Sequence, residues 1–185
     1  MLRKTIAAVL AALAIAPAAQ ATVINFENLS GYGYVPYGYE GVNWFGSWQY
    51  YSFAQDPYNA HSGVERVYSS LSLATSGFSF STDVVFNGAW FASFPDYAVG
   101  YTLLNNGVEV AHVAPISLSG TPTFIASGYS GLVDEVRIDG PQGYFVMDDV
   151  TYNEPNRDVP EPASLALAGL ALASLGVVRY RKRVI

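Results

Sequence analysis

The sequence lacks cysteine and carries very little positive charge outside its two ends. Without cysteine there are no disulfide bonds and no thiolate metal sites, so the fold depends on an apolar core alone. Only Arg66, Arg137 and Arg157 are basic between the two ends, whereas nearly all the acidic residues lie there. Such an acidic surface repels phosphate backbones, so we predict no binding to nucleic acid.

Catalytic signatures are scarce as well. The two histidines, His61 and His112, are too few for a histidine-based metal triad, and the H-E-x-x-H and G-x-S-x-G motifs are absent. A glycoside hydrolase needs only two suitably spaced carboxylates, so the sequence leaves that class open. No predicted strand carries several acids on one face, and we therefore expect a protein that is not an enzyme.

Aromatic residues, in contrast, are abundant at 15% of the chain, with 14 Tyr and 10 Phe. Short stretches of strand-forming residues alternate with turn signals from residue 22 to residue 153, and no stretch has the pattern of an amphipathic helix. The 185 residues suffice for one domain with a core. We predict an all-β fold, a jelly-roll-like antiparallel β-sandwich, with a single up-and-down barrel as the alternative.

The clearest local prediction is a hairpin. Residues 97–104 and 108–114 are strand-like and are separated by Asn105-Asn106-Gly107, in which Asn-Gly suits a type I′ turn. Residues 78–82 alternate Phe with Ser, which is typical of a half-buried strand. The Asn87-Gly88 pair between two further apolar runs predicts either a second hairpin or a β-bulge.

The first 21 residues have the features of a secretory signal peptide. Arg3 and Lys4 precede an apolar run over residues 6–16, and Ala19-Gln20-Ala21 provides a small-x-small cleavage site. We expect cleavage directly after Ala21 and exclude residues 1–21 from the fold.

The C-terminal end has three parts. Pro160, Glu161 and Pro162 interrupt any helix, and residues 163–178 then contain no charge. A basic cluster that would stop transfer through a membrane follows: Arg179, Arg181, Lys182 and Arg183. This order predicts a short transmembrane helix whose basic end stays in the cytoplasm while the domain faces outward.

The order of Pro-Glu-Pro, apolar helix and basic end closely resembles the PEP-CTERM sorting signal of exported proteins in Gram-negative bacteria. The resemblance implies a partner, an exosortase-type membrane enzyme that recognises Pro160, Glu161 and Pro162 and processes the tail. It also implies export across the inner membrane, transient anchoring there, and delivery to the cell surface or extracellular matrix. A plain C-terminal anchor is the alternative.

These features divide the chain into four parts. We predict a signal peptide over 1–21, a β-sandwich domain over 22–154, a Pro-rich linker over 155–162 and a transmembrane helix with its basic tail over 163–185. The domain also resembles a β-sandwich common among PEP-CTERM proteins through three segments: "NFENL", "GYEGVNW" and "FVMDDVTY". Glu27-Asn28 stands where that group has two acids.

The acids of the first and last predicted strands are candidate calcium ligands. In many sandwiches these strands are neighbours, which would bring Glu27 close to Asp148 and Asp149. Adjacent strand residues point to opposite faces, so we expect Asp149 to share a face with Phe145 and Met147, and Asp148 to share the other with Val146 and Val150. The alternative is that these acids only cap strand ends or face water.

A tyrosine-rich stretch over residues 31–53 contains the candidate glycan contacts, because exposed aromatic faces stack on sugar rings. The candidates are Tyr32, Tyr34, Tyr37, Tyr39 and Trp48. The alternative is that some of these rings belong to the core, as we expect for Trp44. The Gly-rich part over 32–39 is unsuited to a central strand, so its rings are expected on a loop.

The resemblance to PEP-CTERM proteins implies an exported protein with a structural or adhesive role at the cell surface or in an extracellular polysaccharide matrix. Two alternatives remain. A carbohydrate-binding module requires exposed aromatic rings that form a platform, and a glycan hydrolase requires two carboxylates that face each other across a cleft.

Overall fold

A computed structural model of the chain describes residues 21–70 and 75–154. The predicted Pro-rich linker, sorting signal and transmembrane helix lie outside these residues, as does the predicted signal peptide except for Ala21. In the described part of the chain, no helix is long and apolar enough to cross a membrane. One short 3-10 turn, η1 (Tyr39–Gly41), is the helical element there, and everything else is strand, turn or loop.

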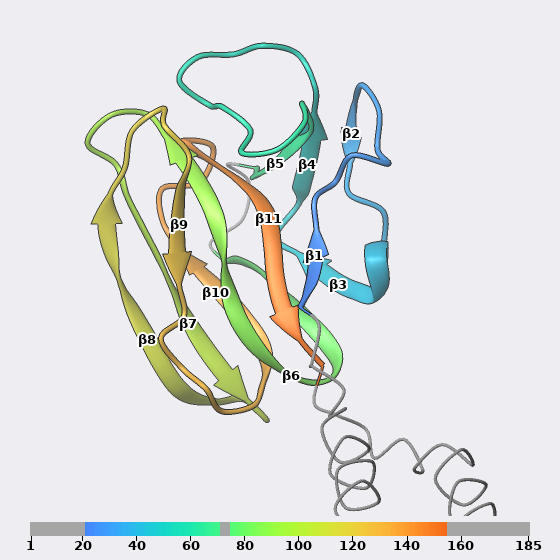
Figure 1. Cartoon of the computed structure of the whole chain (residues 1–185), viewed down its shortest axis with the longest axis vertical. Coiled ribbons are helices and arrows are strands. Elements are labelled where there is room, and N and C mark those ends of the chain that lie inside the picture. The colour runs from blue at the N-terminus through green and yellow to red at the C-terminus, as the bar shows by residue number, and fades with distance from the viewer. Residues whose placement is uncertain (1–20, 71–74, 155–185) are drawn as a thin grey trace, which may run out of the picture. The chain divides into compact units, whose positions relative to one another are not determined.

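All strand pairs are antiparallel, so the predicted all-β antiparallel fold is confirmed (Figure 1). The strands are β1 (Thr22–Ile24), β2 (Tyr32–Tyr34), β3 (Val42–Phe45), β4 (Trp48–Tyr51), β5 (Arg66–Ser69), β6 (Ser76–Ser93), β7 (Ala98–Asn105), β8 (Val108–Ser117), β9 (Thr123–Ala126), β10 (Val133–Asp139) and β11 (Phe145–Asn153).

The long strand β6 belongs to both layers of the sandwich. Its first half, up to Val84, pairs with β3 and β10, and β10 continues the second layer to β7 and β8. Its second half, from Val85, pairs with β11 and β9, and β11 continues the first layer to β5, β4 and β2. The described strands therefore form an open path with β2 and β8 at its ends, and not the closed barrel of the alternative.

The space between the layers is filled by a single aromatic-rich core. Two buried hydrogen bonds from aromatic side chains connect the layers. The Tyr101 hydroxyl on β7 donates to the carbonyl of Ile125 on β9 at 2.6 Å, and the Trp48 indole on β4 donates to the carbonyl of Gly77 on β6 at 2.9 Å. Trp44 is partly buried and packs at the edge of this core, as expected.

Local turn chemistry agrees with the sequence at the β7–β8 hairpin. Asn105 pairs with Val108, and the two loop residues Asn106 and Gly107 have φ values of 52° and 76°. These are the positive φ values of a type I′ turn. At Asn87-Gly88, however, β6 runs on without a hairpin, and the register shift there marks a β-bulge against β11.

The first and last strands are neighbours, as predicted. Thr22 to Ile24 on β1 pair with Tyr152 to Val150 on β11, and Figure 1 shows the two strands side by side. β1 ends at Ile24 because Phe26 has a φ of 61°, which turns the chain and places Glu27 above the loop that joins β4 to β5.

Candidate functional site

The loop between β4 and β5, residues 52–65, covers the outer face of the first layer (the teal loop at the top of Figure 1). An irregular loop has no ladder to satisfy its backbone N–H and C=O groups, which are costly to leave unpaired when buried. In this loop, carboxylates from other elements accept the N–H groups and an arginine donates to the C=O groups. The predicted acidic residues are central to this arrangement.

Asp148 on β11 anchors the middle of the loop. Its Oδ2 accepts the backbone N–H groups of His61 and Ser62, both at 2.9 Å, and its Oδ1 accepts the N–H of Asp149 at 2.7 Å. The residue is only 2% exposed. Both of its oxygens are thus occupied by backbone donors.

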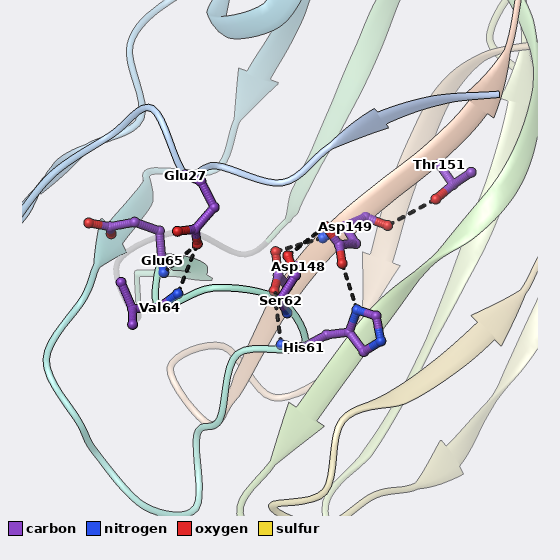
Figure 2. Close-up of polar contacts among 8 residues, drawn as sticks. All are labelled: Glu27, His61, Ser62, Val64, Glu65, Asp148, Asp149 and Thr151. Atoms are coloured by element: carbon purple, nitrogen blue, oxygen red, sulfur yellow. Dashed lines mark hydrogen bonds and ion pairs between the residues drawn. The ribbon is translucent and has the colours of Figure 1, made fainter. Parts of the chain in front are cut away.

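Asp149 adds side-chain contacts to the same loop. Its carboxylate accepts from His61 Nδ1 at 2.6 Å and from the Ser62 hydroxyl at 3.0 Å (Figure 2). The His61 ring also stacks on Trp90, with 3.5 Å between centroids. His61, for which no role was predicted, is therefore held by a hydrogen bond at its ring edge and by stacking on its ring face.

The expected alternation of Asp148 and Asp149 is wrong. A β-bulge with a φ of 44° at Asp149 shifts the register between β11 and β6, so both carboxylates reach the same loop. Beyond the bulge, Val150 faces the main core together with Phe145 and Met147, not with Val146. Bulges of this kind re-aim side chains, and Asp tolerates the left-handed conformation better than most residues.

Glu27 anchors the end of the loop. Its Oε1 accepts the backbone N–H groups of Val64 at 2.9 Å and Glu65 at 2.8 Å. Gly63 lies directly against this carboxylate, and its φ of 50° together with the lack of room for a Cβ explains why glycine occupies the position.

The prediction that Glu27, Asp148 and Asp149 form a calcium site needs correction. Glu27 binds the loop at residues 64–65 and the two aspartates bind it at residues 61–62, so the three carboxylates do not converge (Figure 2). Among the residues described, no three His, Cys, Asp or Glu side chains are grouped as metal ligands. Asp148 and Glu27 instead accept backbone N–H groups, and Asp149 accepts from the His61 ring and the Ser62 hydroxyl.

Arg66, at the start of β5, holds the carbonyl side of the loop. Its guanidinium donates to the carbonyls of Tyr58, Val64 and Phe53 at 2.9, 2.8 and 2.7 Å. It also lies over the Tyr51 ring, 4.0 Å from the centroid. Sequence reasoning missed this residue, although an arginine beside apolar strand residues in an acidic domain is a signal for such a role.

Burial changes the acidity of this region. The pKa of Asp148 is raised to about 7, chiefly by burial and also by the charge of Asp149, although hydrogen bonds from the Ser62, Asp149 and His61 N–H groups act in the opposite direction. Burial likewise raises the pKa of Glu65, which is 3% exposed and accepts from the Gly31 N–H at 3.2 Å. Asp148 and Glu65 thus hold their protons more tightly than carboxyl groups in water do.

The predicted glycan contacts separate into two groups. Tyr32, Tyr34 and Tyr37 are exposed, at 62%, 70% and 90%. Tyr39 is partly buried, stacks on Phe26 and donates to Asn28 Oδ1, and burial beside acidic neighbours raises its pKa to about 12. Trp48 is a correction, because it is 2% exposed and belongs to the core, where no glycan reaches it.

A cavity of about 240 Å³ opens on the outer face of the first layer, between this face and the loop. We call it the aromatic groove and define it by its six principal lining residues: Tyr32, Tyr51, Phe53, Gln55, Tyr58 and Tyr68. Only Tyr32 among these was a predicted contact. The others come from β4, β5 and the loop, and the sequence does not show that these elements meet.

Two further tyrosines lie beside the groove. The rings of Tyr97 and Tyr144 are 4.9 Å apart, and both phenols are close enough to Tyr58 to raise its pKa, after the larger effect of burial. They come from distant parts of the chain, so the aromatic surface extends well beyond the tyrosine-rich stretch of the sequence.

Comparison with known families gives one match. The family model for the PEP-CTERM protein-sorting motif matches residues 158–182. The match contains Pro160, Glu161, Pro162, Arg179, Arg181 and Lys182, all outside the described residues, as is Arg183, one residue beyond the match. A comparison with curated proteins finds no match for the chain.

Proposed function

We propose that this chain, exported and sorted through its PEP-CTERM motif, has a structural or adhesive role at the cell surface or in an extracellular polysaccharide matrix. The motif at residues 158–182 indicates an exported protein that an exosortase processes in the membrane. This match carries the proposal. It begins a few residues after β11 ends at Asn153, so a β-sandwich domain directly precedes the sorting signal.

The tail is proposed to hold the chain transiently in the inner membrane, with the domain outside the cytoplasm. After processing, the domain is released to the surface or the matrix. A compact domain with disulfide-free packing and an acidic surface suits such an environment, because its stability does not depend on redox conditions.

A role without catalysis is part of the proposal, and the geometry around the acids supports it. Both oxygens of Asp148 accept backbone N–H groups, and Asp149 is committed to His61 and Ser62. A glycan hydrolase needs two carboxylates facing each other across a cleft. The described residues that line the aromatic groove include no carboxylate.

The test is the fate of the tail in the natural host. We expect intact mass spectrometry to find a mature species without the tail in the envelope or medium, and the triple variant Pro160→Ala, Glu161→Ala, Pro162→Ala to keep its tail and stay in the inner membrane. Pro155→Ala, outside the matched residues, is the control and should be processed normally. An uncut wild-type tail in the inner membrane, unaffected by the triple variant, would instead mean a plain anchor.

A further inference from the structure

We propose that the aromatic groove binds a neutral polysaccharide and accepts one of its pyranose rings. The inference deepens the surface or matrix role proposed above and rests on it. It names the class of ligand and the site that binds it, and neither follows from the sorting motif.

The groove presents ring faces suited to the C–H faces of a sugar. Tyr32 comes from β2, Tyr51 from β4 and Tyr68 from β5, while Phe53 comes from the loop. Tyr51 fixes its neighbours, with ring centroids 4.8 Å from Phe53 and 5.6 Å from Tyr68. Phe53 is nevertheless 54% exposed, which leaves ring surface free for a ligand. Aromatic walls with a few placed polar groups are typical of small-ligand sites.

The polar groups of the groove are oriented toward hydroxyl ligands. Tyr32 and Tyr68 both donate their hydroxyl hydrogens to the same buried acceptor, Gln49 Oε1, at 2.5 and 2.6 Å. With the hydrogens directed inward, both phenol oxygens keep lone pairs that can accept from sugar hydroxyls. Gln55 at the rim adds a carboxamide that both donates and accepts.

The distribution of charge around the groove disfavours ionic ligands. No charged side chain lines the groove in the described part of the chain. The nearby Arg66 guanidinium already donates to loop carbonyls, so it is not available to bind a carboxylate or sulfate, and its positive charge over Tyr51 disfavours a quaternary ammonium ligand. The acidic domain repels anionic polymers at longer range. Burial raises the pKa of Tyr51, Tyr58 and Tyr68, so these phenols stay neutral near neutral pH.

The size and surroundings of the groove favour part of a polymer over a large free ligand. Its volume of about 240 Å³ is below the roughly 300–1,000 Å³ of drug-sized sites, which suits one sugar ring. The groove is open, and Tyr97 and Tyr144 lie next to Tyr58 at one end. A chain that leaves the groove there meets further aromatic surface.

The experiment measures binding of the full chain, purified in a zwitterionic detergent without a sugar headgroup. The probes are three neutral polymers (dextran, hydroxyethyl cellulose and mannan) and one anionic polymer, alginate, in affinity electrophoresis and calorimetry. We expect binding to at least one neutral polymer, little changed by salt, and none to alginate. Phe53→Ala should weaken it by about tenfold or more, as expected when an aromatic anchor is truncated.

Two variants separate ligand contact from general damage. Tyr68→Phe keeps the ring and removes only the hydroxyl, so we expect a smaller loss of affinity with unchanged circular dichroism. Tyr37→Ala removes a ring that is 90% exposed but lies outside the groove, and it should bind like the wild type. Failure of all three neutral polymers to bind overturns the proposal. So does an equal loss in Tyr37→Ala and Phe53→Ala, or salt-sensitive binding to alginate alone.

The outcome is independent of the sorting test. Phe53→Ala is expected to be exported and processed like the wild type, because it leaves residues 158–182 intact. Normal processing with no polymer binding would refute the groove proposal alone. Binding to a neutral polymer by a chain whose tail is never cut would instead refute the proposed sorting and leave the groove proposal standing.

Discussion

At the scale of single residues, Asp148 holds the loop through its carboxyl group, and its burial makes the stability of the fold depend on pH. It is almost fully buried, and three backbone N–H groups point at it. Burial outweighs these donors and raises its pKa from 3.8 to about 7. Between these two values the folded chain binds the proton more tightly than the unfolded chain does.

The sign of the pH dependence follows from this difference. Because the folded state binds more protons, the free energy of unfolding should fall as pH rises from about 4 to about 7 and then level off. The Asp148 contribution is on the order of a few kcal/mol. Asp148→Asn should flatten this part of the profile, measured by urea unfolding across the pH range.

Asp148→Asn should also lower the free energy of unfolding. The asparagine NH₂ group is a donor, and it would face a backbone N–H group that the aspartate oxygen accepts. The expected loss is about 1–3 kcal/mol at the acidic end, and it should disappear above pH 7, where the wild type itself has lost at least as much. Asp96→Asn, at an exposed position, is the matched control and should keep the wild-type profile. A pH profile for Asp148→Asn that runs parallel to the wild type would show that another group titrates.

At the scale of elements, the loop over residues 52–65 depends on one cation as much as on the three acids. Arg66 donates to carbonyls spread along the loop, and it is only 4% exposed. A lysine has a single nitrogen and cannot reproduce the planar, multi-donor geometry. The wall of the aromatic groove is thus held by a residue that does not line it.

Arg66→Lys is expected to loosen this loop while leaving the sandwich folded. Amide hydrogen exchange at residues 53–65 should speed up, and the free energy of unfolding should drop by about 1–3 kcal/mol. Exchange in β7 and β10 should not change. Arg137→Lys, an exposed arginine on β10 that pairs with Glu135, is the control and should leave the loop amides protected. Unchanged exchange in Arg66→Lys would mean that the acids alone hold the loop.

The same scale shows where sequence reasoning succeeds and where it stops. The β7–β8 hairpin was predictable because Asn106-Gly107 encodes its turn locally, and the β1–β11 pairing followed from a general feature of sandwiches. Which side chains of "WQYY" point into the core was not predictable, because four large residues in a row show no alternation of apolar and polar. Trp48 was therefore predicted as a glycan contact and Tyr51 was not, although Trp48 enters the core and Tyr51 belongs to the outer cluster.

The candidate site was harder to predict than the fold because it combines a bulge with long-range contacts. The bulge at Asp149 is invisible in "FVMDDVTY", and without it the two aspartates point to opposite faces. The partners of Asp148 in the loop are backbone N–H groups 86 and 87 residues away, which carry no sequence signature. The pair of adjacent aspartates therefore suggested a cation site, whereas in the structure the pair binds a loop.

At the scale of the whole molecule, β6 makes the two layers one unit. Because a single strand contributes to both, neither layer keeps its ladder when the other opens. We expect one cooperative unfolding transition, with tryptophan fluorescence and far-UV circular dichroism coinciding in urea.

Trp48→Phe tests this coupling at a contact between the layers. The change leaves the Gly77 carbonyl without its indole donor and should lower the free energy of unfolding by about 1–3 kcal/mol. Both probes should shift together, and Trp48→Phe should remain a single transition. Two separated transitions in either protein would show that the layers unfold independently.

The position of β11 has a mechanical consequence. Its first residues, Phe145 and Val146, lie under the aromatic groove, and its last, Asn153, leads toward the tail. If the proposed ligand in the groove and the proposed anchor at the tail are both present, tension between them would pull β11 lengthwise. The ladders with β6 and β1 then share the load in shear, whereas force on an edge strand such as β8 would open its pairs one after another. Under these two proposals, force from the C-terminal end would act along β11, the direction in which its ladders with β6 and β1 resist together.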